Sequence, residues 1–252
     1  MFDAKKTTEE IITFIQDYYN KYNLYGVVLG ISGGKDSGVV AGLFVKALGA
    51  ERVIGVTLPC HSKDEDKIDA KLVSDHYGFK LLNLDLTDTF DTFKNSIHHL
   101  DMESIDSDIN LKPRLRMASL YYIAQLYSTN TKKPYLVAGT SNKCELYVGY
   151  FTKGGDNVHD ISVLGDLTVD EVIKVGEYLN VPEKVLYKAP ADGLSNLTDE
   201  DKLGVSYKNI ANYIENGTIE DKEAEQKIIS LHNRNQHKFV IPTYRKDQHE
   251  TK

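Results

Sequence analysis

Residues 26–48 constrain the fold most strongly, because an apolar run passes through a turn of small residues into a second apolar run. Gly26–Ile31 has the length of a buried strand, and Val39–Leu48 has the composition of a helix. Between them lies Ser32-Gly-Gly-Lys-Asp-Ser37. Glycine allows positive φ and close backbone approach, and the N–H groups at a helix start can donate to phosphate oxygens. The stretch therefore predicts a nucleotide-phosphate site in an α/β fold.

This turn departs from both common glycine-rich nucleotide motifs. Lys35 and Asp36 hold the fifth and sixth places after Gly30, where a Walker A loop has Gly and Lys, and G-x-G-x-x-G does not fit either. Gly33 and Gly34 would allow positive φ in this turn. A carboxylate beside phosphate is repulsive unless a cation lies between them, so Asp36 implies Mg²⁺. A plain strand-to-helix turn is the alternative, which the density of Gly, Ser and Asp makes the weaker one.

Short β-rich runs and helical segments alternate along the rest of the chain. We expect strands at 27–31, 53–58, 81–86 and 135–138, and helices at 7–20, 39–48, 64–77, 113–127 and 168–179. This alternation predicts an α/β fold, a doubly wound parallel sheet flanked by helices, Rossmann-like and built as a single domain over residues 1–252. Ligands of such sheets sit beyond the carboxyl ends of the strands. The turns at 32–37, 59–63 and 139–145 would converge there.

The local sequence also predicts where three helices begin. Thr7-Thr8-Glu9-Glu10 has the pattern of a capped helix start, and Thr168 has Glu171 as a capping partner. A third helix is expected to start at Pro113. Weak periodicity and several acids predict a poorly ordered excursion over residues 96–112.

Composition limits the classes of partner. The chain has 252 residues, 41% of them hydrophobic, and a net charge of −7, so we expect no nucleic-acid partner bound through its backbone. Cys60 and Cys144 lack paired metal spacing and are expected to be reduced thiols in a cytoplasmic protein. No apolar run approaches the roughly 20 residues of a membrane span, and we expect neither a membrane partner nor a targeting segment.

A second polar loop follows the strand expected at 135–138. Gly139–Asp156 contains Thr140, which could bond a nucleotide, and Glu145, a second carboxylate for a metal. Lys153 adds a positive charge in a glycine-rich segment that could move. Taken alone, this segment would be interpreted as an ordinary solvated loop. Together with the phosphate loop, a functional loop becomes the favoured interpretation.

Several motifs together resemble a known family. The string Ser32–Ser37 resembles the pyrophosphate loop of the ATP pyrophosphatase superfamily, and the chain as a whole is similar to ammonia-dependent NAD synthetases. The further segments that carry this resemblance are Lys112–Met117, Gly139–Glu145, Val148–Asp156, Pro190–Leu194, Thr198–Tyr207 and His237-Lys238. The resemblance implies an adenine nucleotide alpha-hydrolase-like fold and a homodimer with substrate near the interface.

The resemblance also implies roles for individual residues. ATP would be bound by Gly30, Ile31, Ser32, Gly33, Gly34, Lys35, Asp36, Ser37, Thr140 and the backbone of Ala191. Mg²⁺ would be held by Asp36 and Glu145. Deamido-NAD would be bound by Arg114, Phe151, Lys153, Asp160, His237 and Lys238, with Asp36 and Lys153 serving catalysis. Val169 stands where many bacterial relatives have a Lys that reaches ATP, and it is expected to be core instead.

The reaction implied is the amidation of deamido-NAD by ammonia, with ATP cleaved to AMP and pyrophosphate through an acyl-adenylate. The synthetase fold takes up 252 residues and leaves no room for a glutaminase, so free ammonia is the expected donor. Two rivals stay open. A transfer-RNA modifying ATP pyrophosphatase would share the loop but normally adds a basic face or paired cysteines, and a non-enzymatic nucleotide-binding module would not need Asp36 and Glu145.

Overall fold

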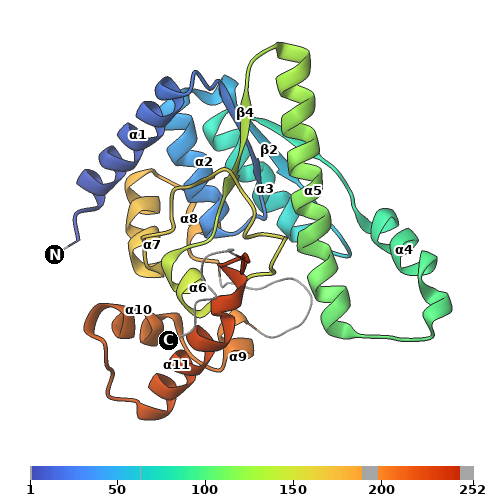
Figure 1. Cartoon of the computed structure of the whole chain (residues 1–252). Coiled ribbons are helices and arrows are strands. Elements are labelled where there is room, and N and C mark those ends of the chain that lie inside the picture. Colours follow the sequence, from blue (N-terminus) through green and yellow to red (C-terminus); the bar gives the residue numbers. More distant parts are fainter. Residues whose placement is uncertain (1, 63, 189–197, 245–252) are drawn as a thin grey trace.

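The core of the protein is a five-stranded parallel sheet (Figure 1). The computed structural model describes residues 2–62, 64–188 and 198–244. The strands are β1 (Gly26–Gly30), β2 (Val53–Thr57), β3 (Lys80–Asn83), β4 (Tyr135–Gly139) and β5 (Ile161–Ser162). Their order is β3-β2-β1-β4-β5, and every pairing is parallel. The doubly wound α/β fold expected from the sequence is confirmed.

Helices follow the strands in the expected alternation, with additional short helices towards the C-terminus. Their bounds are α1 (Ala4–Lys21), α2 (Lys35–Leu48), α3 (Asp64–Tyr77), α4 (Thr87–Ser96), α5 (Ile105–Thr131), α6 (Lys143–Val148), α7 (Val169–Tyr178), α8 (Glu183–Leu186), α9 (Asp199–Leu203), α10 (Tyr207–Asn216) and α11 (Lys222–Asn235). Short 3-10 helices cover Ala50–Arg52, His98–Leu100 and Gln236–Lys238. Among the described residues, no helix is long and apolar enough to cross a membrane.

Two apolar layers bury the sheet. On one face, α1, α2, α3, α7 and α8 pack over a cluster that includes Leu29, Phe44 and Leu164, all fully buried. On the other face, α4 and α5 cover Val28, Val56 and Val137. The central strand β1 is buried on both faces, as a parallel sheet requires. A third cluster joins α6 to α9, α10 and α11 beyond the carboxyl ends of the strands (Figure 1).

Three expectations about segment boundaries are wrong. Helix α1 begins after Asp3, whose carboxylate accepts from the N–H of Lys6 at 3.0 Å, whereas the expected start Thr7–Glu10 lies inside the helix, where the Thr8 hydroxyl donates to Ala4 O. Strand β3 covers Lys80–Asn83 and so ends three residues before the expected 86; the bond from Leu84 N–H to the carbonyl of Thr57 is the last one of its ladder with β2. The third concerns residues 96–112.

Helix α5 starts eight residues before Pro113. Its cap is Ser104, whose hydroxyl accepts from Ser107 N–H at 3.2 Å, and Pro113 lies inside the helix. The segment 96–112 does leave the body of the protein, as predicted, but it is largely helical and not irregular (Figure 1). Weak apolar periodicity misled the prediction because this part of α5 projects from the body with α4 and has little core to face (Figure 1).

Candidate active site

The phosphate loop joins β1 to α2. Gly33 has φ +79°, a conformation that favours glycine, whereas Gly34 has φ −100° and is the residue before α2, so of these two glycines only Gly33 adopts the positive φ that both allow. Ser37 donates its hydroxyl to Gly34 O at 2.9 Å, and Gly34 N–H donates to Ser32 Oγ at 3.2 Å. These bonds fix the loop around the first turn of α2.

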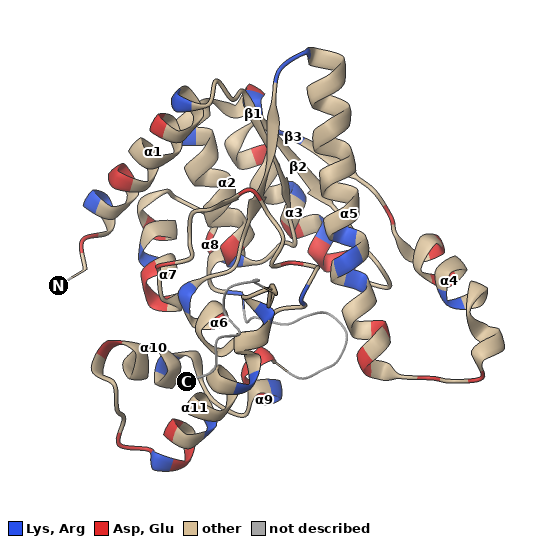
Figure 2. Ribbon diagram, in the orientation of Figure 1, with Lys and Arg blue, Asp and Glu red and all other residues tan. Residues whose placement is uncertain are grey.

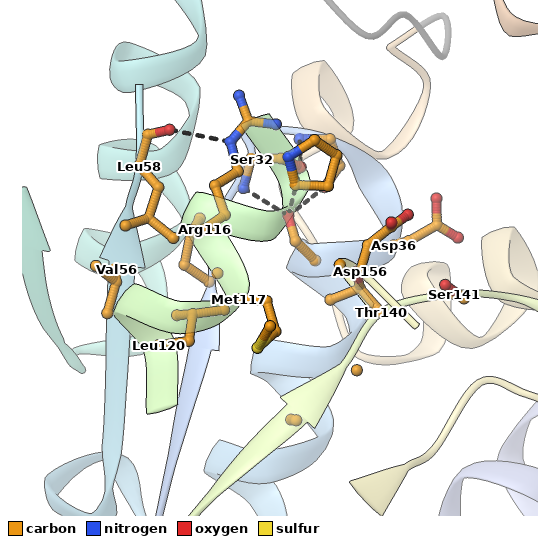
Figure 3. A pocket seen from close by; sticks show the side chains of 18 of the residues that line it. Ser32, Asp36, Val56, Leu58, Arg116, Met117, Leu120, Thr140, Ser141 and Asp156 are labelled. Atoms are coloured by element: carbon orange, nitrogen blue, oxygen red, sulfur yellow. Dashed lines mark hydrogen bonds between the residues drawn. The ribbon is translucent and has the colours of Figure 1, made fainter. Parts of the chain in front are cut away.

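A cleft of about 420 Å³ opens at the carboxyl ends of the strands. It is lined by the loop residues except Gly33, by Pro59 after β2 and by Thr140 after β4, so the three predicted turns do converge. The centre lies where β1 neighbours β4 and the strand order reverses, the usual ligand position in such sheets. Figure 3 shows an apolar end with Val56, Leu120 and Met117.

The opposite end of the cleft is acidic (Figure 3). Asp36 in the first turn of α2 and Glu145 in α6 both line it. Asn142 connects the two: its side-chain amide donates to Asp36 Oδ1 at 3.2 Å, and its backbone N–H donates to Glu145 Oε2 at 3.1 Å. Asn142 is fully buried and caps α6. Asn142 thus hydrogen-bonds to both predicted metal ligands, Asp36 and Glu145.

The electrostatics of this end suit a divalent cation. Burial and the neighbouring Asp36 carboxylate raise the pKa of Glu145 well above its usual range. Lys35 Nζ, 3.2 Å from Asp36 Oδ2, offsets only part of the negative charge. No three His, Cys, Asp or Glu side chains of the described residues are grouped for a metal. A Mg²⁺ ion held by Asp36 and Glu145 would complete its shell with phosphate and water, as Mg²⁺ usually does.

Most of the predicted substrate residues gather outside the cleft lining. Lys153 Nζ donates to His237 O at 2.6 Å, and Arg114 donates to Lys153 O at 3.3 Å. Lys238 Nζ donates to Gly149 O at 2.7 Å and to Phe151 O at 2.8 Å. The C-terminal segment is therefore tied to the loop after α6. Roles in substrate binding for Arg114, Phe151, Lys153, His237 and Lys238 stay predictions.

Asp160 lies apart from that group. Its carboxylate accepts from Val137 N–H at 2.8 Å and from Tyr121 O–H at 3.1 Å, so it extends the β4 edge and anchors α5. Ala191 falls outside the described residues. Val169 begins α7 and packs partly buried against the third core cluster, as expected, and Thr168 N–H donates to Glu171 at 2.8 Å.

Sequence reasoning missed several residues that line or shape the cleft. Asn142 shapes the cleft from behind its lining, and the lining itself includes Lys67, Arg116, Met117, Tyr150, Asp156, Lys188 and Asp199. Arg116 donates its Nε–H to Leu58 O at 3.1 Å, which aims the side chain across the cleft (Figure 3). Arg116 stood in the motif that carried the resemblance, so a signal existed for it, and Figure 2 shows the basic residues of this part of α5. Lys188 had none in the sequence reasoning.

Comparisons with known proteins agree with this geometry. The family model described as NAD synthase matches residues 7–252. The chain belongs to the NAD synthase family. A relative named NH(3)-dependent NAD(+) synthetase, from Carboxydothermus hydrogenoformans, is 36% identical over 241 residues and is covered to 96%, with 94% of this chain aligned.

Two solved structures of family-like proteins show the same fold. An NH3-dependent NAD synthetase from Campylobacter jejuni superposes with a TM-score of 0.78 at 28% identity, covering 97% of this chain and 99% of that one. An NMN synthetase from Francisella tularensis superposes with a TM-score of 0.89 at 32% identity, covering 98% of this chain and all of the other. The parallel sheet and its helices are therefore the family's fold.

Proposed function

We propose that this chain carries out the reaction of ammonia-dependent NAD synthetases, the amidation of deamido-NAD with ATP and ammonia to give NAD, AMP and pyrophosphate. One observation carries the proposal: the phosphate loop and the Asp36–Glu145 pair meet in a single cleft of a chain that belongs to this family. The family match from residue 7 to 252 supports one synthetase domain over the whole chain. Two buried free thiols suit a cytoplasmic protein.

The chemistry explains why such a cleft is needed. A nicotinate carboxylate is a poor acyl donor, because it is anionic and would have to expel oxide. Attack of one carboxylate oxygen on the α phosphorus of ATP forms a P–O bond and releases pyrophosphate. Ammonia then attacks the acyl carbon, loses a proton, and AMP leaves with that oxygen. The enzyme supplies alignment and charge neutralisation, and needs no covalent nucleophile.

The residues of the cleft divide these tasks by position. The apolar end with Val56, Met117 and Leu120 suits a base, and the loop N–H groups with Ser32 and Ser37 suit phosphates. We propose Asp36 and Glu145 as Mg²⁺ ligands and Thr140 as an ATP contact. Mg²⁺, when bound, would offset the charge that gathers on pyrophosphate.

Heavy-oxygen labelling tests the acyl-adenylate. Substrate carrying heavy oxygen in its carboxylate is expected to transfer one labelled oxygen to AMP, measured by mass spectrometry after one turnover. Label found in pyrophosphate or in released phosphate, with none in AMP, would contradict it.

The nitrogen source is tested with the same protein. Ammonium is expected to support the reaction and glutamine to support little, and equal rates with both would refute ammonia as the donor.

A second candidate substrate is the mononucleotide. The NMN synthetase from Francisella tularensis matches this chain over its whole length with the higher TM-score of the two structures above. Such an enzyme would use the same cleft and the same adenylation. Its substrate would be the acid form of NMN, which lacks the adenylate half of deamido-NAD. The ratio of kcat/KM for the two acids distinguishes these candidates.

The protein is proposed to act as a homodimer through the arm formed by α4 and the start of α5. This arm exposes large apolar side chains: Met102 is 77% exposed and Ile105 is 79% exposed. A monomeric protein would be expected to have polar side chains at such positions. Arg114 and Lys153 are also exposed, near the same helix, so a second copy would add a wall to the substrate site. Light scattering should give the dimer mass, and Ile105→Asp should lower it. A monomer mass in active solution would refute the proposal.

A further inference from the structure

Two lysines share one buried carboxylate behind the phosphate loop. Asp69 in α3 has no exposed surface, and Lys184 Nζ lies 2.7 Å from its Oδ1 while Lys188 Nζ lies 2.7 Å from its Oδ2. Lys188 Nζ also lies 2.9 Å from Asp66 Oδ1. Asp69 therefore has a lysine on each oxygen, and each lysine also faces a second carboxylate, since Lys184 Nζ lies 3.9 Å from Glu65 Oε1.

This cluster packs directly against the loop. A Cβ atom on Gly33 would lie 2.6 Å from Asp66 O and 3.1 Å from Asp69 Cβ. Asp66 and Lys188 line the cleft, whereas Asp69 and Lys184 are not among its lining residues. Of the two lysines, only Lys188 faces the space in which a nucleotide would lie.

Lys188 can leave its partners at little cost to the fold. If its ammonium turned away, Asp69 would keep Lys184 on the other oxygen, and Asp66 is partly exposed. A buried carboxylate left without any partner would be strongly destabilising, so the second lysine is what makes Lys188 free to move. Two other cleft-lining lysines have their own carboxylates: Lys35 pairs with Asp36, and Lys67 lies between Asp64 and Asp85.

The ammonium of Lys188 is available as a cation. Partial burial opposes its charge, but hydrogen bonds to Asp69 and Asp66 outweigh that and raise the pKa of Lys188 above the ordinary lysine value. A triphosphate brings more negative charge than the loop N–H groups can offset, and an ammonium is an effective partner for phosphate oxygens.

We propose that Lys188 binds the β and γ phosphates of ATP and the pyrophosphate formed from them, turning from Asp66 towards the loop while Lys184 keeps Asp69 neutralised. This rests on the proposed function only in taking a polyphosphate as the ligand of the cleft. Lys188 would then hold the leaving group, and Lys184, which does not line the cleft, would act only through Asp69.

The matched pair Lys188→Gln and Lys184→Gln tests the proposal, because both variants remove one cation from Asp69. Calorimetric titration of the full chain with Mg-ATP, Mg-pyrophosphate and AMP should show Lys188→Gln weakening the first two by about tenfold or more, with AMP within about twofold. Lys184→Gln should weaken the first two by clearly less, because Lys188 still lines the cleft but is then the remaining lysine on Asp69, and it should leave AMP within about twofold. Lys188→Arg should restore most of the lost affinity, and urea unfolding should show comparable losses for the two Gln variants.

Three results would overturn it: unchanged pyrophosphate binding in Lys188→Gln, equal weakening in both Gln variants, or AMP weakened as much as pyrophosphate. The readout is independent of amidation. Wild-type protein that binds pyrophosphate through Lys188 but makes no amide would preserve this inference and remove the proposed function.

Discussion

Replacing Gly33 by alanine tests how the phosphate loop is held against α3. Alanine at φ +79° costs about 1–2 kcal/mol in backbone strain. The new Cβ would also lie 2.6 Å from Asp66 O, a backbone atom that cannot swing aside, and overpacking of this kind costs about 1–3 kcal/mol. Gly33→Ala should therefore lower the free energy of unfolding by about 2–5 kcal/mol in total.

Two other glycines supply the controls. Gly78 has φ +75° with nothing within 4 Å of an added Cβ, so Gly78→Ala should show the strain alone, about 1–2 kcal/mol. Gly34 has φ −100°, and its added Cβ would meet only Ser32 Oγ at 3.3 Å, so Gly34→Ala should cost less than about 1 kcal/mol. Urea unfolding followed by circular dichroism gives the three values. Gly33→Ala no more destabilising than Gly78→Ala would refute the packing argument.

Three further predictions concern the contacts around the site. Asp69→Asn should lose about 1–3 kcal/mol of stability at neutral pH, because it removes the buried charge that pairs with two partly exposed lysines. Burial opposes the charge of Asp69, but Lys184 and Lys188 hold its pKa below the usual value. The advantage of the wild type is therefore present above the unfolded pKa and should shrink as pH falls through the folded pKa, and an advantage independent of pH down to strong acid would contradict this. Lys238→Met should cost about 1–2 kcal/mol, since hydrogen bonds of a charged group to the carbonyls of Gly149 and Phe151 are lost, and an unchanged urea midpoint would show that water replaces them. Asn142→Ala should cost about 1–2 kcal/mol as a lost helix cap and should also lower kcat by freeing Asp36, whereas full activity at reduced stability would confine Asn142 to capping.

Local sequence patterns predicted the parts of the fold that depend on local physics. The strand-turn-helix at 26–48 and the alternation of strands and helices gave the sheet and its direction, and carboxyl-end turns converge because parallel strands require it. The start of α1 was misplaced because Thr7-Thr8-Glu9-Glu10 has the local pattern of a capped start, although Asp3 is the cap. Pro113 was read as a helix start, since nothing local shows that the preceding segment continues as helix.

The contacts that shape the site join residues far apart in the sequence. Asn142 reaches Asp36 across 106 positions, and Lys188 reaches Asp69 across 119, so neither pairing has a local signal. Asp36 and Glu145 were each proposed as metal ligands from their own loop. The pKa of Glu145 is raised by burial, which cannot be read from the amino-acid composition. The sequence could nominate the carboxylates, but only the packed structure shows what holds them.

The measurement that tests the account most directly is product formation by purified protein with Mg²⁺, ATP and ammonium, with deamido-NAD and the acid form of NMN supplied in parallel. NAD, AMP and pyrophosphate are expected in equal amounts from deamido-NAD. The Asp36→Ala variant should form none of these products. Amide formed only from the mononucleotide would contradict the choice of substrate, and amide formed with ADP and phosphate in place of AMP and pyrophosphate would contradict the chemistry assigned to the cleft.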